Sequence, residues 1–141
     1  MLSYLEPVDD GLPVRESGVW AAEKLDYLSR YINIFEAAMK AKWLVRNYVD
    51  LMAGPGKNLV RDTGEILLGS PLLSLTTHHP FTGYFFVESS EEYARVLEQR
   101  CAASPLSAQV NISMGDCNEL VSDIVRQINR SDTRSLNLAF L

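Results

Sequence analysis

The spacing of apolar residues predicts one long amphipathic helix near the start of the chain. From Ser17, the expected N-cap, to about Trp43, apolar residues recur at alternating intervals of four and three positions, which is the pattern of one helix face. The stripe consists of Ala21, Leu25, Leu28, Ile32, Phe35 and Met39, and Trp20, Tyr27 and Tyr31 broaden it. We expect this helix to lie across a sheet.

Four apolar segments after this helix have the length and composition of strands buried in a parallel sheet. Ser89-Ser-Glu-Glu92 has the form of a capping box that opens a helix, and so does Asp116-Cys-Asn-Glu119. Strands that alternate with helices indicate an α/β protein with a Rossmann-like, doubly wound parallel sheet. The predicted strands are 47–52, 82–88, 109–114 and 136–141.

The segment after the first predicted strand does not continue directly as a helix. A glycine-rich turn, Ala53–Lys57, comes first, and Asp62-Thr-Gly-Glu65 then predicts a turn between two short apolar pieces, as in a small hairpin. A short helix is expected to follow, with Ser70 as its N-cap and Pro71 at its first position.

That short helix is expected to end near His78 and His79. Adjacent histidines point to different sides of a helix, and no third ligand lies near them in the sequence. We interpret the pair as helix-end residues favoured by the helix dipole, and we predict no metal site.

The length of 141 residues allows at most one domain. Residues 1–16 are polar, contain Pro7, Gly11 and Pro13, and predict an irregular leader before a domain over residues 17–141. The last predicted strand has no helix after it to cover the sheet. The domain is therefore expected to be truncated, the N-terminal part of a larger fold.

Net charge and cysteine content narrow the classes of function and the compartment. A net charge of −5 argues against a nucleic-acid-binding surface over the whole molecule, although Lys40, Lys42, Arg46 and Lys57 leave a local basic patch open. Cys101 and Cys117 do not form a CxxC pair, and we expect them to be reduced and structural.

The sequence contains neither of the segments that would direct it to a membrane. No apolar run approaches the ~20 residues of a membrane span. The first ten residues lack the basic region and apolar core of a signal peptide. A cytoplasmic location is therefore expected, without a membrane partner.

Three of the predicted strands end in an acid, namely Asp50, Glu88 and Asp116. Ligands of open parallel sheets bind outside the carboxyl ends of the strands, where the strand order reverses. An acid after the second strand can accept the hydroxyls of a ribose, and one after the third can accept the amine of an adenine. Each acid could instead cap the helix that follows it. Three acids in register with a glycine turn favour a nucleoside site.

The glycine turn itself narrows the choice of nucleoside. Gly54 and Gly56 can adopt positive φ and have no Cβ to block a ligand. The turn lacks the Gly-x-x-x-x-Gly-Lys-Ser/Thr spacing of a triphosphate-binding loop. Leu59 occupies the place of the third glycine in a dinucleotide motif. S-adenosylmethionine, which has no phosphate, fits better, and another adenine nucleoside remains the alternative.

Six ordered segments cover most of the chain from Trp20 onward: Trp20…Lys24-Leu25…Leu28…Tyr31, Tyr48-Val-Asp-Leu-Met-Ala-Gly-Pro-Gly56, Thr63-Gly-Glu-Ile66…Gly69-Ser-Pro-Leu72, Phe86-Val-Glu88, Gly115-Asp-Cys-Asn118 and Leu138-Ala-Phe-Leu141. Together they resemble the three-Cys-motif partner proteins. That family is similar to the class I S-adenosylmethionine-dependent methyltransferases. Met52 stands where the family usually has Phe.

The resemblance implies a site for S-adenosylmethionine. Asp50, Gly54 and Gly56 would line its methionine end, Glu88 its ribose and Asp116 its adenine. In the family the last strand continues into an Asp-Pro-x-Gly-like motif, which would follow Leu141. No catalytic residue is therefore named. The methyl acceptor stays open, and nucleic acid is among the possible acceptors. The neighbours that complete the predicted cofactor-binding set are Ala53, Pro55, Ser89 and Cys117.

A second hypothesis is a non-catalytic interaction module with the same fold. The fourth predicted strand would be exposed, and an unpaired strand edge is a template for association. It could pair with a second copy of the chain or with another protein. The family name itself refers to a genomic partner protein.

Overall fold

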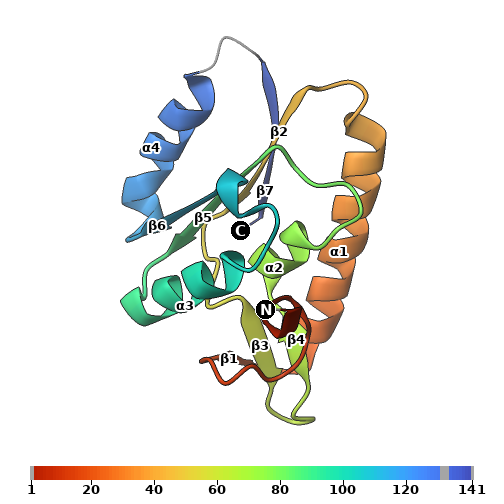
Figure 1. Ribbon diagram of the computed structural model, residues 1–141, viewed down its shortest axis with the longest axis vertical. Coiled ribbons are helices and arrows are strands. Elements are labelled where there is room, and N and C mark those ends of the chain that lie inside the picture. The colour runs from red at the N-terminus through yellow and green to blue at the C-terminus, as the bar shows by residue number, and fades with distance from the viewer. Residues whose placement is uncertain (1, 131–133, 141) are drawn as a thin grey trace.

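A computed structural model describes residues 2–130 and 134–140. Its main sheet is parallel throughout and has the strand order β6-β5-β2-β7 (Figure 1). The order matches the first four positions of the 3-2-1-4-5-6 arrangement, and it reverses between β2 and β7. The strands are β2 (Val45–Asp50), β5 (Gly83–Glu88), β6 (Val110–Met114) and β7 (Ser135–Phe140). The four predicted strands are confirmed, although Leu141 lies outside the described residues.

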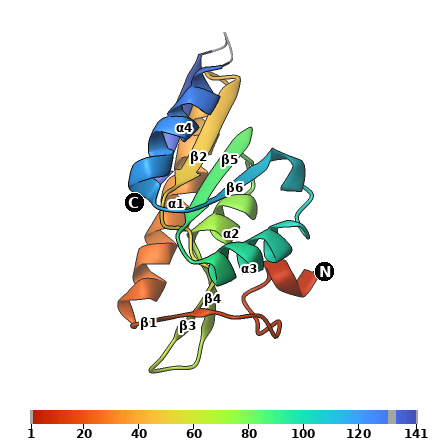
Figure 2. The same cartoon turned by 90° about the vertical axis from the view of Figure 1, so that its left-hand side faces the viewer.

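Helices cover both faces of this sheet, so the fold is mixed α/β and compatible with a Rossmann-like arrangement. Leu28, Leu72 and Leu97 share one core cluster, whereas Ile124 belongs to a second cluster on the opposite face. Figure 2 shows α4 on one side and α2 and α3 on the other. The helices are α1 (Trp20–Met39), α2 (Ser70–Leu75), α3 (Glu91–Cys101) and α4 (Cys117–Asn129).

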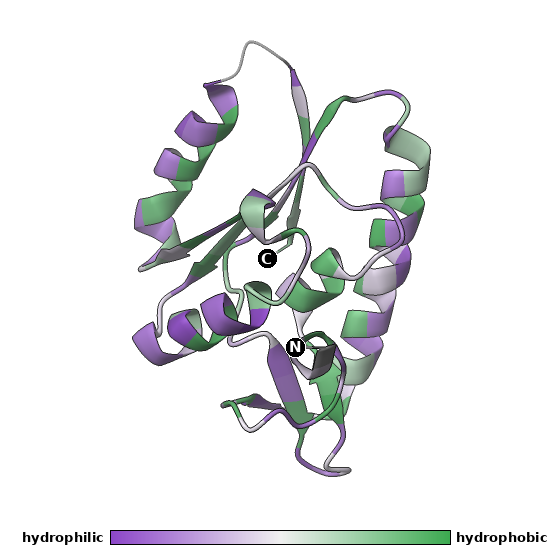
Figure 3. Ribbon diagram, viewed as in Figure 1, coloured by the Kyte–Doolittle hydropathy of each residue, from purple (hydrophilic) through white to green (hydrophobic). Residues whose placement is uncertain are grey.

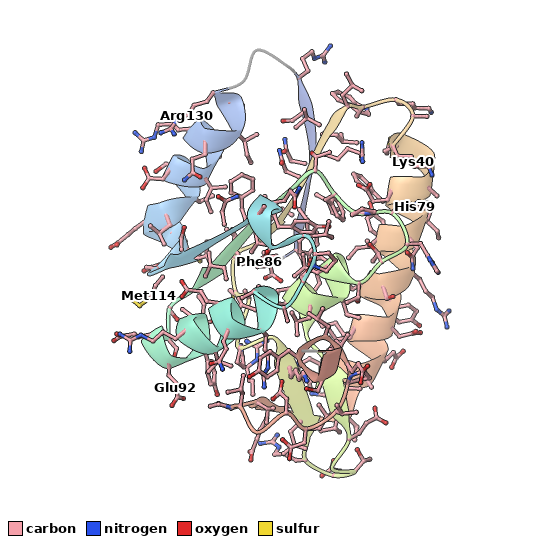
Figure 4. All side chains as sticks on the ribbon, viewed as in Figure 1. Lys40, His79, Phe86, Glu92, Met114 and Arg130 are labelled. Carbon is pink, nitrogen blue, oxygen red and sulfur yellow. The ribbon has the colours of Figure 1, made fainter. Side chains whose placement is uncertain are left out.

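The larger core cluster is built around aromatic rings. The ring of Tyr48 lies 5.4 Å from that of Phe81 and 6.3 Å from that of Phe86. Figure 4 places Phe86 near the middle of the molecule. The smaller cluster has one aromatic ring, Phe85, among aliphatic side chains, and Figure 3 shows the hydrophobic side of α4 turned toward the sheet. The face covered by α1, α2 and α3 is therefore the richer of the two in aromatic rings.

A second, smaller sheet extends from the glycine turn. The predicted hairpin is confirmed, because β3 (Lys57–Val60) and β4 (Ile66–Leu68) pair antiparallel. A third strand, β1 (Arg15–Ser17), pairs parallel with β3 and was not predicted. Two short 3-10 helices, η1 (Leu2–Leu5) and η2 (Ser107–Gln109), complete the elements.

The leader, predicted to be irregular, is bound to the domain through a buried acid. Asp10, with a side chain 1% exposed, accepts from Lys57 Nζ at 2.9 Å and from Arg100 Nη2 at 2.8 Å. Arg100 also donates to the carbonyls of Leu12 and Pro13. Lys57 from β3 and Arg100 from α3 therefore hold the leader in place. The leader can pack on the domain without a periodic pattern of apolar residues.

Two helix starts differ from the prediction. Ser17 is not an N-cap, since it ends β1 and α1 begins at Trp20. Ser70 is the first residue of α2, and Gly69 is the N-cap. The backbone at both places already takes part in other structure. Ser17 belongs to β1, and Gly69 N, just before Ser70, donates a hydrogen bond to the carbonyl of Gly56 at 2.7 Å.

The later caps agree better with the sequence. Ser90, the second serine of the predicted capping box, accepts from Tyr93 N and caps α3. Asp116 caps α4 as predicted, accepting from Asn118 N at 2.8 Å.

Two of the four basic residues that left a local patch open in the sequence are paired with acids in the structure. Helix α1 stops at Met39, and Arg46 pairs with the buried Glu36 at 2.8 Å. Lys57 is fully buried against Asp10. The pair His78 and His79 follows α2, which ends at Leu75, so the helix-end interpretation was wrong. His79 Nδ1 lies 3.3 Å from Lys40 Nζ, and Figure 4 labels both residues beside the C-terminal end of α1.

Candidate functional site

The glycine turn between β2 and β3 is held from two sides. Gly54 N donates to Glu88 Oε1 at 2.8 Å, and Ala53 N donates to the carbonyl of Val87 at 2.9 Å, both on β5. The carbonyl of Pro55 accepts from Arg100 Nη1 at 2.7 Å. The turn therefore has a fixed shape, set by the neighbouring strand and by α3.

Both glycines of the turn adopt the left-handed backbone that favours glycine, with φ of +74° at Gly54 and +100° at Gly56. A Cβ at Gly54 would lie 2.9 Å from Cζ of Arg15, and a Cβ at Gly56 would lie 3.2 Å from the side chain of Leu72. The space that the sequence suggests for a ligand is thus occupied by side chains of the chain itself. At Gly54 that side chain is a cation.

Asp50 ends β2 beside this turn and is 1% exposed. Its Oδ2 accepts from Ser70 Oγ, and its Oδ1 accepts from Met52 N at 3.3 Å. Burial raises the pKa of Asp50 to about 6, although these hydrogen bonds and the positive charge of Arg15 act in the opposite direction. A carboxylate has about four acceptor positions, so two remain for a ligand.

A cavity of about 380 Å³, here called the β2–β7 cavity, opens in front of Asp50. It lies at the carboxyl ends of β2 and β7, where the strand order reverses and where open α/β sheets bind ligands. Its size falls within the roughly 300–1,000 Å³ of small-molecule sites. Its wall combines charged, hydroxyl and aromatic groups, among them Arg15, Ser17, Trp20, Lys24, Asp50, Ser70 and Phe140.

Glu88 lies next to the cavity but not on its wall. The side chain is 7% exposed. Oε1 accepts from Gly54 N and Oε2 accepts from Ser90 N, each at 2.8 Å. Ser89, also predicted to bind the cofactor, is exposed at the start of the connection to α3. Glu88 therefore joins the glycine turn to the loop after β5.

Asp116 and Cys117 lie one strand further away. Asp116 is exposed and caps α4, and Cys117 begins that helix and packs against the smaller core cluster. Gly115 N donates to the carbonyl of Glu88 at 3.0 Å, which joins the ends of β5 and β6. The sheet order places Asp50, Glu88 and Asp116 on adjacent strand ends, as predicted, and only Asp50 lines the β2–β7 cavity.

Of the residues that line the β2–β7 cavity, only Asp50 belongs to the predicted cofactor-binding set, and the omissions include Arg15, Trp20 and Lys24. Arg15 belongs to the predicted irregular leader, and Trp20 and Lys24 were placed on the amphipathic helix and in the first segment of the resemblance without a role in the site. The segment Val14-Arg-Glu-Ser17 is too short to predict a strand. Trp20 is 65% exposed, which is an unusual position for a tryptophan and the clearest signal that this end of α1 borders a site.

Both cysteines are free thiols, as expected. Burial raises the pKa of Cys101 to about 12, so this thiol is unreactive at neutral pH. Within residues 2–130 and 134–140, no three histidine, cysteine or acidic side chains form a group that could hold a metal ion. None of the helices in those ranges is long and apolar enough to cross a membrane.

No family model, curated protein or solved structure matches the chain. The resemblance to three-Cys-motif partner proteins therefore stays a prediction from the sequence.

Proposed function

We propose that this chain binds S-adenosylmethionine as a methyltransferase-like domain of the class I type. The observation that carries the proposal is a buried carboxylate, Asp50, at the carboxyl end of β2, facing a cavity at the reversal of strand order. The motif resemblance supports the same ligand. S-adenosylmethionine has no phosphate, which agrees with a turn that lacks the spacing of a triphosphate-binding loop.

The chain's own residues suggest how the ligand would lie. Asp50 has free acceptor positions for the ligand's ammonium group, and the methionine end would occupy the β2–β7 cavity. The nucleoside end would extend over the ends of β5 and β6 toward Glu88 and Asp116. Bound S-adenosylmethionine supplies an electrophilic methyl group, and the domain would contribute orientation of that group toward an acceptor.

Differential scanning fluorimetry with four ligands tests this proposal. We expect S-adenosylmethionine and S-adenosylhomocysteine to raise the melting temperature, because a ligand that binds only the folded state stabilises it. Adenosine and NAD serve as comparisons for the alternative adenine-nucleoside ligand. If the folded protein shows no shift with millimolar S-adenosylmethionine or S-adenosylhomocysteine, the proposal fails. An equal response to adenosine would favour the alternative.

The second candidate function, an interaction module, is favoured by the outer edge of β7. Among the described residues β7 pairs with β2 alone, and an apolar groove of about 680 Å³ runs between β7 and α1. Tyr27, Tyr31 and Ile34 border this groove and are 56–70% exposed. The occupant we infer is a second copy of the chain, because two such edges can pair about a two-fold axis and cover both grooves.

Sedimentation velocity separates this candidate from the first. We expect the wild-type chain to dimerise and Ile34→Lys to be monomeric, since a charge would enter the apolar groove. Val125→Lys is the matched control, because Val125 is an exposed apolar residue on α4, away from β7. A monomeric wild type at high concentration would exclude self-association through β7.

A further inference from the structure

Arg15 is a cation on the wall of the β2–β7 cavity for which residues 2–130 and 134–140 provide no partner. Within the described ranges, its guanidinium makes no hydrogen bond and no ion pair, whereas Arg46 and Arg100 are both paired with acids. An arginine has five N–H donors in a planar fork, and one that lines a cavity without an acceptor is available to a ligand.

The position of Arg15 is fixed by two neighbours. β1 pairs with β3 in the register Arg15↔Asn58, which sets the backbone of Arg15 beside the start of the hairpin. Its Cζ lies 2.9 Å from the site that a Cβ of Gly54 would occupy, so the guanidinium rests on the glycine turn. The absence of a side chain at Gly54 therefore makes room for this cation.

Asp50 lies across the same cavity and carries the opposite charge. The two side chains line one space, and the positive charge of Arg15 favours the ionised form of Asp50, yet they form no ion pair. An acid and a base held apart across a cavity match a ligand that carries both charges on adjacent groups. An α-amino acid is such a ligand, with a carboxylate and an ammonium group on one carbon.

We propose that Arg15 binds the α-carboxylate of the ligand while Asp50 binds its α-ammonium group. The inference rests on the proposed function and names the residue that selects the amino-acid end of S-adenosylmethionine. The guanidinium fork matches a carboxylate in two parallel hydrogen bonds, which a lysine cannot reproduce. Arg15 is thus a specificity-determining residue supplied by the leader.

Lys24 is the rival cation on the cavity wall and provides the matched control. Its Nζ lies 5.2 Å from the ring centroid of Phe140, in a cation–π contact, and its side chain is exposed. Replacing Arg15 or Lys24 by glutamine removes the same charge from the same cavity. Only the Arg15 change removes the group that rests on the glycine turn.

The test is isothermal titration calorimetry with S-adenosylhomocysteine and with methylthioadenosine, which keeps the adenosine and thioether but lacks the amino-acid end. We expect Arg15→Gln to weaken binding of S-adenosylhomocysteine by about 10- to 100-fold, the range for a lost hydrogen bond to a charged group. Methylthioadenosine should bind equally well to wild type and variant. Arg15→Lys should give an intermediate loss, and Lys24→Gln a small one.

Each other outcome has a definite meaning. If Arg15→Gln binds S-adenosylhomocysteine as tightly as the wild type does, Arg15 does not contact the carboxylate and the inference is overturned. If it weakens both ligands equally, Arg15 acts by shaping the turn, which also overturns it. If the wild type binds neither ligand, the proposed function itself fails, and the inference fails with it. Far-UV circular dichroism of each variant confirms that the fold is intact.

Discussion

Glu88 accepts a hydrogen bond from the backbone N–H of Gly54 at 2.8 Å, so the acid at the end of β5 holds the glycine turn that follows β2. Its second oxygen accepts from Ser90 N at the same distance. One buried side chain therefore couples the two loops that border the candidate site. The position of Glu88 between these loops is consistent with a ligand site. Its two hydrogen bonds to backbone N–H groups are also consistent with a purely structural function.

Replacing Glu88 by alanine should destabilise the protein by about 1–3 kcal/mol for each backbone donor left buried without an acceptor. Urea unfolding measures the change. Glu92→Gln is the control, since Glu92 is exposed in the first turn of α3, as Figure 4 shows, and should change stability by less than about 0.5 kcal/mol. Equal stabilities for Glu88→Ala and the wild type would show that water satisfies both donors.

Replacing Asp50 by asparagine should stabilise the protein at pH 7. The pKa of Asp50 is raised to about 6 in the folded state, so between pH 4 and pH 6 the folded state holds a proton that the unfolded state has lost. Stability therefore falls as pH rises through this window, by about 3 kcal/mol if the shift of about two pKa units is complete.

The measurement for Asp50→Asn is the free energy of unfolding at several pH values from 4 to 7. The fall in stability seen in the wild type should be absent in the variant. Glu16→Gln is the control, because Glu16 lines the same cavity with an exposed side chain. Parallel pH profiles for wild type and Asp50→Asn would contradict the argument. Binding of S-adenosylmethionine should weaken in the variant even as stability rises.

Replacing Asp10 by asparagine should destabilise the fold by about 3–5 kcal/mol, because Lys57 and Arg100 would remain buried without a counter-charge. Burial acts to raise the pKa of Asp10, but hydrogen bonds from Arg100 and Lys57 outweigh it and hold the pKa below its usual range. The stabilisation is therefore present above pH 4 and is lost as the pH falls further.

Asp9→Asn is the matched control for Asp10, since Asp9 is exposed and its carboxylate contacts only Gly11 N, at 2.9 Å, among the described residues. Chemical unfolding at pH 7 and pH 3 measures both variants. The wild type should lose stability between these values by more than Asp10→Asn does. If the two lose the same amount, Asp10 is not the group responsible.

Gly54→Ala and Gly64→Ala form a pair that separates backbone strain from ligand binding. Both positions have positive φ, +74° and +72°, and each substitution should cost about 1–2 kcal/mol. At Gly64 the new Cβ meets open space, whereas at Gly54 it displaces the guanidinium of Arg15. Affinity for S-adenosylhomocysteine, measured by calorimetry, should therefore fall for Gly54→Ala alone. Equal affinities in both variants would contradict a binding role for Arg15.

The periodicity of apolar residues was sufficient to predict the α/β class and the main elements. A strand buried on both faces must be apolar along its length, as in β5, and a helix on a sheet must be apolar on one side, as in α4. The sequence also predicted that the acids after β2, β5 and β6 lie at one edge of the sheet, because parallel strands all end at the same edge. These features depend on local sequence and could be identified without the structure.

Only the tertiary structure decided which of these acids borders the cavity and which cation stands opposite it. Arg15 reaches the turn because β1 pairs with β3, a contact between segments 43 positions apart that no local pattern encodes. The same holds for Asp10, whose partners Lys57 and Arg100 come from β3 and α3. Sequence alone determined where the strands of the main sheet end and where its helices begin to within a few residues, whereas β1 was missed. Long-range pairing determined which charges meet there, because it depends on how separate elements pack.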